Sequence, residues 1–491
     1  MTRGMTVKRG AHSAVHGAHS AVAVRRGTYT TVTASTTARR GIYTAVTALL
    51  ALTALQGVQG SSAAADTGTP TTGPGAPATW QPQGRPLAGA ATTADAPAMQ
   101  PGVTYRDTIK VGETRIYGIT LDDKSSAYAS AFALPPSGGR VAYGDGIELK
   151  LESADGTDCD SADAHFQDDG AVRPVGSAVA RLMRVDTSCQ EANQYTLSVH
   201  RTSDGASDPA PWPLELRYVL EPPLKSGAAA GHAPDGLGTA SPTPLTVGTP
   251  QQATGGTSFE TAAAVKTGIW KDKVLPGETR FYKVPVDWGQ QATVFSDFSS
   301  AQVTDSGAYV GSGVRLAAYS PVRELIDDQE HSYEGTPASV HEQLAPVSYA
   351  NRAADDTDVA RVRYAGWYYF AVTVHPDVAK AVSGPVPVTL RVNVTGTAQP
   401  APAYAGDPKG AGIGVDAHDV SAANGTPQSA GSSSGNSAKR FLGFAALGAG
   451  TVLVLALAVW VLTARRRVAA VPDTVTQQLP PQSGFGPPPS W

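Results

Sequence analysis

The feature that most constrains the fold is a segment that occurs twice, 165 residues apart. The first copy, YRDTIKVGETRIY, begins at Tyr105, and the second copy, WKDKVLPGETRFY, begins at Trp270. Gly-Glu-Thr-Arg is identical in both copies. The blocks that follow also end alike, with LSVH at 197–200 and VTVH at 372–375. Such a repeat predicts two copies of one structural module.

Apolar and polar residues alternate near the end of each block, in PLELRYVL at 213–220 and PVTLRVNV at 387–394. A period of two is typical of a strand with one buried face. Several short strands of this kind, separated by turns, favour an antiparallel sandwich. We therefore expect a mainly β protein with two tandem antiparallel β-sandwich domains, at 101–221 and 258–396.

The start of each block resembles the bacterial pre-peptidase C-terminal domain. In the second block the matching residues are Gly277, Glu278, Tyr282, Val284, Gly289 and Val294. In the first block they are Gly112, Glu113, Tyr117 and Ile119, and the second turn, DDKSSA, lacks the glycine. The resemblance implies jelly-roll-like sandwiches that serve as non-catalytic appendages, for targeting or for binding a polymer such as a glycan or collagen.

Three segments outside the blocks are rich in Ala, Gly, Pro, Thr and Ser, namely 66–100, 222–257 and 397–438. They hold too few apolar residues to bury a core of their own, so we predict disordered linkers. The third segment would be a flexible stalk between the outer domains and a membrane.

The first 65 residues have the pattern of a secretory signal peptide with a long basic leader. An apolar run at 42–55 is followed by the small-residue sequence SSAAA, which suits signal-peptide cleavage. The length of the leader is explained either by a start further downstream or by a twin-arginine signal at Arg39-Arg40. A first transmembrane helix is the alternative, and the shortness of the apolar run disfavours it.

Residues 441–463 contain no charged side chain and are long enough to cross a bilayer as a helix. Three arginines, at 465–467, follow directly, as expected on the cytoplasmic side. We therefore predict a single-pass type I protein of the cell membrane. It would have a large extracellular part and a short cytoplasmic Pro-rich tail at 464–491.

The exported part, 66–438, carries 41 acidic and 26 basic residues. Such an excess of acid repels phosphate backbones, so no nucleic-acid partner is expected.

Cys159 and Cys189 are the only cysteines. An even number in an oxidising compartment predicts a disulfide, with two free thiols as the alternative. Four aspartates surround the first cysteine, and these candidate Ca²⁺ ligands are Asp155, Asp158, Asp160 and Asp163. A solvated acidic loop is the alternative reading, and no other cofactor is expected.

No motif predicts catalysis. His341-Glu342 lacks the second histidine that a zinc-protease helix needs, and the Gly-x-Ser-x-Gly match at 431–435 lies in the predicted stalk. The aromatic run at 367–370 should place two rings in the core and two on the other face, where carbohydrate stacking is the alternative to packing.

We therefore predict no enzyme but a membrane-anchored binding or adaptor protein of the cell surface. Its partner would be an extracellular ligand or a membrane protein that the sequence does not identify, and no oligomeric state is predicted. The alternatives are a transmembrane sensor or assembly component that signals through the Pro-rich tail and a hydrolase with an unrecognised site.

Overall fold

The structure is a computed structural model that describes residues 77, 79–136, 139, 141–166, 172–183, 188–203, 207–226 and 241–425. The predicted signal peptide, transmembrane helix and tail lie outside these residues. Within the described part, no helix combines the length and the apolar character that a membrane span requires.

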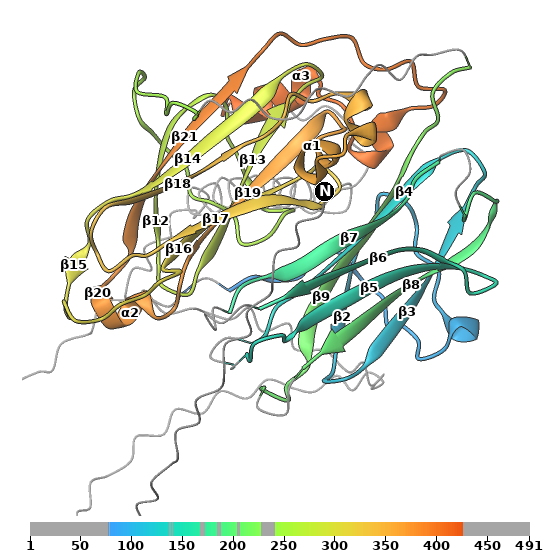
Figure 1. Cartoon of the computed structure of the whole chain (residues 1–491), viewed down its shortest axis with the longest axis horizontal. Coiled ribbons are helices and arrows are strands. Elements are labelled where there is room, and N and C mark those ends of the chain that lie inside the picture. Colours follow the sequence, from blue (N-terminus) through green and yellow to red (C-terminus); the bar gives the residue numbers. More distant parts are fainter. Residues whose placement is uncertain are drawn as a thin grey trace, which may run out of the picture. The chain divides into compact units, whose positions relative to one another are not determined.

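Eight strands in two antiparallel sheets form the first sandwich, coloured blue to green in Figure 1. One sheet has the order β2 (Thr104–Ile109), β9 (Trp212–Glu221), β4 (Ser126–Ala133), β7 (Val175–Arg181). The other has the order β3 (Thr114–Leu121), β8 (Asn193–Thr202), β5 (Gly146–Ser153), β6 (Asp158–His165). A two-residue strand, β1 (Arg85–Pro86), pairs parallel with β2 at the edge.

The second sandwich, yellow to orange in Figure 1, also has two main sheets. One has the order β12 (Gly268–Val274), β21 (Val386–Thr395), β14 (Gln291–Phe298), β18 (Ala338–Gln343). The other has the order β13 (Thr279–Val286), β19 (Gly366–Val374), β16 (Val314–Tyr319), β17 (Leu325–His331). The two-residue strands β10 (Gln251–Gln252) and β11 (Ala263–Ala264) pair parallel with β12 and β13.

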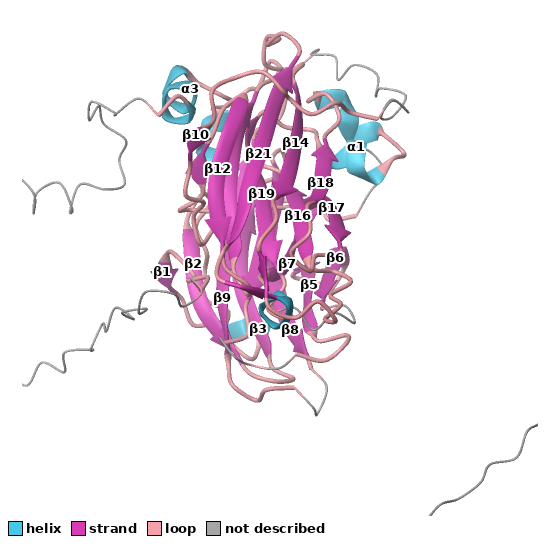
Figure 2. Cartoon of the chain, turned by 90° about the vertical axis from the view of Figure 1, so that its left-hand side faces the viewer, coloured by secondary structure: helices cyan, strands magenta, loops and turns pink. Residues whose placement is uncertain are grey.

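The remaining elements are short, and two of them, α1 (Thr357–Arg361) and α3 (Ala417–Ala423), lie beside the sheets in Figure 2. The others are β15 (Gln302–Val303), β20 (Val382–Ser383), η1 (Thr93–Asp95), η2 (Tyr349–Ala353), α2 (Val378–Ala381) and η3 (Pro408–Ala411). The prediction of a mainly β protein built from antiparallel sheets is confirmed.

The two sandwiches have the same order of strands. The order β2-β9-β4-β7 of the first corresponds to β12-β21-β14-β18 of the second, and β3-β8-β5-β6 corresponds to β13-β19-β16-β17. The two Gly-Glu-Thr-Arg segments therefore occupy equivalent places, at the turns that lead into β3 and β13.

The repeated segment holds an N-terminal arm against each sandwich. Asp107 Oδ2 accepts hydrogen bonds from the Tyr117 hydroxyl and from the Gly89 amide, each 2.8 Å long. Glu113 accepts from the Lys110 amide (2.7 Å), and Arg115 donates to the Gly89 carbonyl (2.8 Å). The second sandwich makes the same bonds. Asp272 accepts from the Tyr282 hydroxyl and the Gly255 amide, Glu278 accepts from the Leu275 amide, and Arg280 donates to the Gly255 carbonyl. The conserved spacing within the chain thus has a structural cause.

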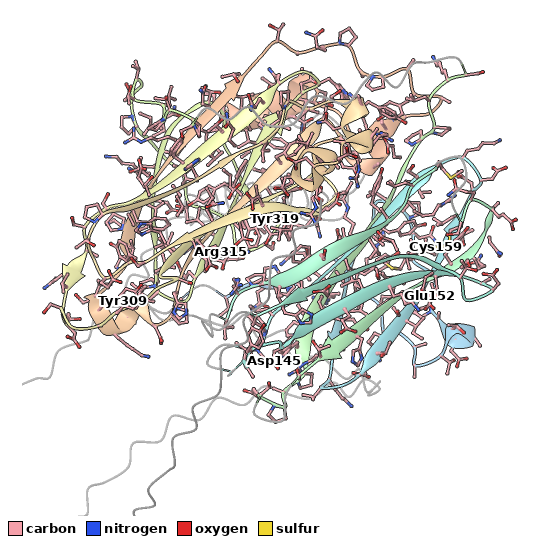
Figure 3. All side chains as sticks on the ribbon, in the orientation of Figure 1. Asp145, Glu152, Cys159, Tyr309, Arg315 and Tyr319 are labelled. Carbon is pink, nitrogen blue, oxygen red and sulfur yellow. A yellow bond between two sulfur atoms is a disulfide. The ribbon has the colours of Figure 1, made fainter. Side chains whose placement is uncertain are left out.

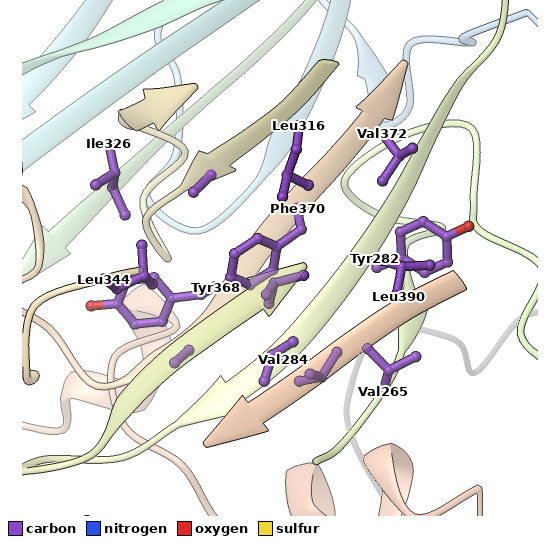
Figure 4. Packing of buried hydrophobic residues seen from close by; sticks show 14 of the residues in the cluster. Val265, Tyr282, Val284, Leu316, Ile326, Leu344, Tyr368, Phe370, Val372 and Leu390 are labelled. Carbon is purple, nitrogen blue, oxygen red and sulfur yellow. The ribbon is translucent and has the colours of Figure 1, made fainter. Parts of the chain in front are cut away.

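Alternation along the strands places one face of each sheet in a core. In the second sandwich, Tyr282, Val284, Leu316, Phe370 and Leu390 meet between the two sheets (Figure 4), and each is fully buried. Burying such a side chain contributes about 1.5–3 kcal/mol, so this core is the main source of stability of the module.

The outer faces of two sheets, one from each sandwich, pack on each other. Phe132 of β4 lies edge-on to Tyr319 of β16 and to Phe259, with ring centroids 5.7 and 4.7 Å apart. Phe281 and Tyr369 of the second sandwich belong to the same buried cluster. This contact explains why β4 is buried along its whole length.

Parts of the predicted linkers are ordered, so that prediction is wrong for them. Trp80 and Met99, within 66–100, are 5% and 2% exposed. Tyr404 and Ile413, in the predicted stalk, are also buried, and β10 lies in the predicted middle linker. These segments have few apolar residues, but they dock on sheets that already exist and therefore need no core of their own.

Candidate functional site

The predicted disulfide is confirmed. Cys159 and Cys189 are bonded, with their Cα atoms 5.7 Å apart, and Cys159 lies on β6 (Figure 3). The bond closes a loop of 30 residues, which stabilises the fold by about 3–4 kcal/mol in the chain-entropy model. Its role is structural.

The four predicted calcium ligands lie on β6 and the turn before it, but each has its own protein partner. Asp155 accepts a hydrogen bond from the Ser153 hydroxyl, and Asp158 pairs with Lys150 at 2.6 Å. The other two partners are the Ala180 amide, 2.7 Å from Asp160, and His165, 3.3 Å from Asp163. The structure does not bring the four carboxylates together, and no calcium site enters the function proposed below.

One group of metal-type ligands converges among the described residues, namely Asp416, His418 and Asp419 at the start of α3. There Asp416 and Asp419 form a capping box, each accepting from the other's backbone amide. The cluster is explained by helix capping.

Two of the hollows on the surface contain charged side chains that are already paired. One lies on the polar face of β3, β8, β5 and β6, where Lys150 pairs with Glu152 and Asp158. The second includes Arg315, labelled in Figure 3, which pairs with Asp328 at 2.7 Å. The first hollow also has the exposed Glu148 in its lining.

A third hollow, which we call the junction groove, has a volume of about 550 Å³ and walls from both sandwiches. Its lining residues are 83–85, 102–104, Arg217, Glu260, Pro321, Trp367, Tyr369 and Gly412. This volume lies in the range of small-molecule sites.

Strand alternation in β19 delivers the aromatic side chains of the groove. Tyr368 and Phe370 point into the core of the second sandwich, whereas Trp367 and Tyr369 lie on the opposite face and line the groove. The predicted alternation is confirmed, but only Trp367 is partly exposed, because Tyr369 is 8% exposed and belongs to a second buried cluster. Trp367 is only partly buried, and its Nε1 donates to Asp419 Oδ1 at 2.8 Å, which fixes the orientation of the indole.

Arg217 lies on the outer face of β9 and is one of three charged residues that line the groove, together with the exposed Arg85 and with Glu260. The side chain is partly buried, and its buried Nε has no hydrogen-bond partner among the residues that the structure describes. Burial, followed by the nearby guanidinium of Arg323, lowers the pKa of Arg217. A cation in this position is stripped of part of its water, and Glu260 and Glu215 attract it without accepting a hydrogen bond from it in the described part of the chain.

Arg323, next to it, forms ion pairs through both terminal nitrogens, although its buried Nε has no partner among the described residues. It donates to Glu215 at 2.8 Å and to Glu260 at 2.7 Å, and so joins the two sandwiches. Glu260 also accepts from the Thr104 hydroxyl at 2.8 Å. Burial alone would raise the pKa of Glu260, but Arg323, Thr104 and, more weakly, Arg217 and Lys283 hold it below its usual value. The carboxylates near the groove therefore form their ion pairs with Arg323 and attract Arg217 without a hydrogen bond.

The side of the junction groove that the first sandwich forms requires glycine at one position. Gly84 has a φ of 99°, and a Cβ added there would lie 2.1 Å from the Thr104 carbonyl oxygen. Only glycine allows the arm to approach β2 this closely, and this approach sets the floor of the groove.

Sequence reasoning found Trp367 and Tyr369 but missed Arg217 and Glu260. Apolar and polar residues alternate around Arg217 in β9, so the sequence of this strand alone predicts that Arg217 faces solvent. The available clue was the density of charge on that face of β9, where Glu215 and Glu221 flank Arg217 at intervals of two and four residues. Several charged residues on one face of a strand can indicate that this face packs against another part of the protein.

No protein-family model matches the chain, and no curated protein matches its sequence. Among solved structures, the pre-peptidase C-terminal domain of collagenase from Bacillus anthracis is 13% identical over 25% of this chain and 94% of that domain, with a TM-score of 0.17. The tandem CBM22-1–CBM22-2 domain of Xyn10C from Paenibacillus barcinonensis is 12% identical over 59% of this chain and 85% of that one, with a TM-score of 0.16. TM-scores this low carry no argument about function.

Proposed function

We propose that the chain is a non-catalytic protein of the cell surface, whose two fused sandwiches bind a ligand in the junction groove. One observation carries the proposal: the walls come from both sandwiches, and they bring together in one hollow the partly exposed Trp367 and Arg217, whose Nε has no hydrogen-bond partner among the described residues. An aromatic face with a few placed polar groups is the usual composition of a ligand site.

The proposal includes export and anchoring. The signal peptide at 1–65 would direct the chain across the membrane, and the helix at 441–463 would hold it there with the tail 464–491 inside. Support comes from the charge and hydropathy of these segments. Protease added to intact cells should remove the part between the two segments, and protection of that part would contradict the proposed orientation.

We also propose that the sandwiches are duplicated copies of one jelly-roll-like module of the type found as pre-peptidase C-terminal domains. The equal strand orders and the equal bonds of Asp107 and Asp272 support this origin. Duplication followed by face-to-face packing would create a groove that one module lacks.

The groove is tested with purified full-length protein and a labelled panel of oligosaccharides and collagen-like peptides, read by fluorescence polarisation. Trp367→Ala should weaken binding of the captured panel members at least tenfold, because the ring supplies the largest contact face. Tyr309→Ala is the matched control, since Tyr309 is 80% exposed on a loop and does not line the groove.

Two results would refute the proposal: a panel from which nothing binds, or binding that Trp367→Ala leaves unchanged. The ligand should be recovered chemically intact after incubation, and turnover would refute the non-catalytic assignment.

A further inference from the structure

The side chain of Arg217 is the one feature of the junction groove that the fold does not explain. Five arginines that are more buried each donate hydrogen bonds to carboxylates or carbonyls; they are Arg181, Arg201, Arg315, Arg323 and Arg363. Arg217 forms no ion pair or side-chain hydrogen bond with any residue in the described ranges. A buried or half-buried charge is costly unless it is paired.

A carboxylate is the group that best relieves this cost, because the planar guanidinium can donate two parallel hydrogen bonds to it. The two carboxylates that attract Arg217, Glu215 and Glu260, form their hydrogen bonds elsewhere. Glu215 is held by Arg323 and by the Gln83 amide at 2.6 Å, and Glu260 is held by Arg323 and Thr104. A directly hydrogen-bonded anion for Arg217 is therefore a role that a ligand could fill.

We infer that the junction groove binds an acidic saccharide, with Arg217 pairing with the carboxylate of a uronic-acid unit and Trp367 contacting its ring. This inference rests on the function proposed above and names its ligand class. The indole suits a sugar because it is a rigid apolar surface, and hydrogen bonding to Asp419 holds it in place. The Lys283 ammonium lies over the ring, 4.8 Å from its centroid, so the sugar would take the face that Lys283 leaves free.

An acidic peptide fits the groove less well. Peptides commonly dock by adding a strand to a free sheet edge. The edge strand at this groove, β1, has only two residues, and one of them, Pro86, has no backbone N–H. A peptide that docked on β1 would therefore form few backbone hydrogen bonds. A sugar does not need a strand edge, because its hydroxyl groups can bond to side chains and to single backbone groups.

The test is isothermal titration of the full-length protein with trisaccharides of galacturonic, glucuronic and mannuronic acid, each as the free acid and as the methyl ester. The ester keeps the size and the hydroxyl groups but removes the charge. At least one free acid should bind at least tenfold more tightly than its ester. Arg217→Gln should remove that difference by weakening the acid and leaving the ester unchanged.

Arg391→Gln is the control of equal charge change. Arg391 pairs with Asp297 on a sheet of the second sandwich that does not line the groove, so binding should be unaffected. Circular dichroism of both variants checks that they are folded.

The outcomes separate this inference from the proposed function. Acid and ester that bind equally, and that both depend on Trp367, would overturn the acidic class and leave the groove as a site. Failure of all three acids to bind would also overturn it, and so would a triglutamate peptide that binds more tightly than the acids through Arg217.

Discussion

Glu342 gives the sharpest prediction about stability. It lies on β18 with 3% of its surface exposed, and its Oε1 has no hydrogen-bond partner in the described part of the chain. Burial, followed by the negative charges of Asp327, Asp328 and Asp358, raises the pKa of Glu342 to about 9. The carboxyl group is therefore protonated in the folded protein at neutral pH.

The size of this destabilisation follows from the linkage between protonation of Glu342 and folding. The unfolded chain has the ordinary pKa of 4.5, so at pH 7 folding must protonate a carboxylate that water would keep ionised. The difference of about 2.5 pH units, at about 1.4 kcal/mol each, costs about 3 kcal/mol. Because the folded state binds the additional proton, the contribution of Glu342 to stability falls as the pH rises from about 4.5 to 9.

Glu342→Gln removes this cost while keeping the shape of the side chain. We expect the midpoint of thermal unfolding, followed by circular dichroism, to rise by roughly 6 °C at pH 7 and to change little at pH 5. Glu148→Gln, at an exposed position of β5, should change neither value. An equal change at both pH values, or no increase at pH 7, would refute the assigned protonation state.

Two further predictions concern the connections within the fold. Arg323→Met should lower the free energy of unfolding by about 3–5 kcal/mol in urea titrations, because it leaves the fully buried Glu215 without its cationic partner and with only the Gln83 amide as a donor. Adding Glu215→Leu should recover most of that loss, and a double variant as unstable as the single one would contradict the explanation. Replacing Cys159 and Cys189 together by serine should cost about 3 kcal/mol, measured against the oxidised wild type. A reducing agent should then destabilise the wild type but not the variant.

The strands could be predicted because their information is local. In β21, Val388, Leu390 and Val392 face the core and alternate with polar residues, so a period of two identifies the strand without any knowledge of its neighbours. The repeat added the module boundaries, since Gly112 and Gly277 open the same turn in both sandwiches.

The contact between the sandwiches could not be predicted in the same way. In β4, SAYASAFA, both faces are buried, one in the core and one against the second sandwich. One face carries four alanines and the other carries two serines, Tyr128 and Phe132, but the sequence does not say which partner covers each face. The ordered segment around Trp80 was not predicted for a related reason. Composition is averaged over a whole segment, so one buried aromatic ring has little effect on it.

The groove was predictable only in part. Trp367 and Tyr369 followed from alternation, but their meeting with Arg217 depends on two strands, β9 and β19, that are 150 residues apart in the chain and belong to different modules. A site made by packing two modules has no short sequence motif.

Differential scanning calorimetry of the full-length protein tests the central claim, that the two sandwiches form one unit with the groove between them, most directly. The face-to-face packing of Phe132 on Tyr319 and the ion pair of Arg323 with Glu215 predict one cooperative transition for the two sandwiches, which Arg323→Met shifts as a whole. Two separate transitions, of which Arg323→Met shifts only one, would show that the modules unfold independently and that the groove is not a stable feature.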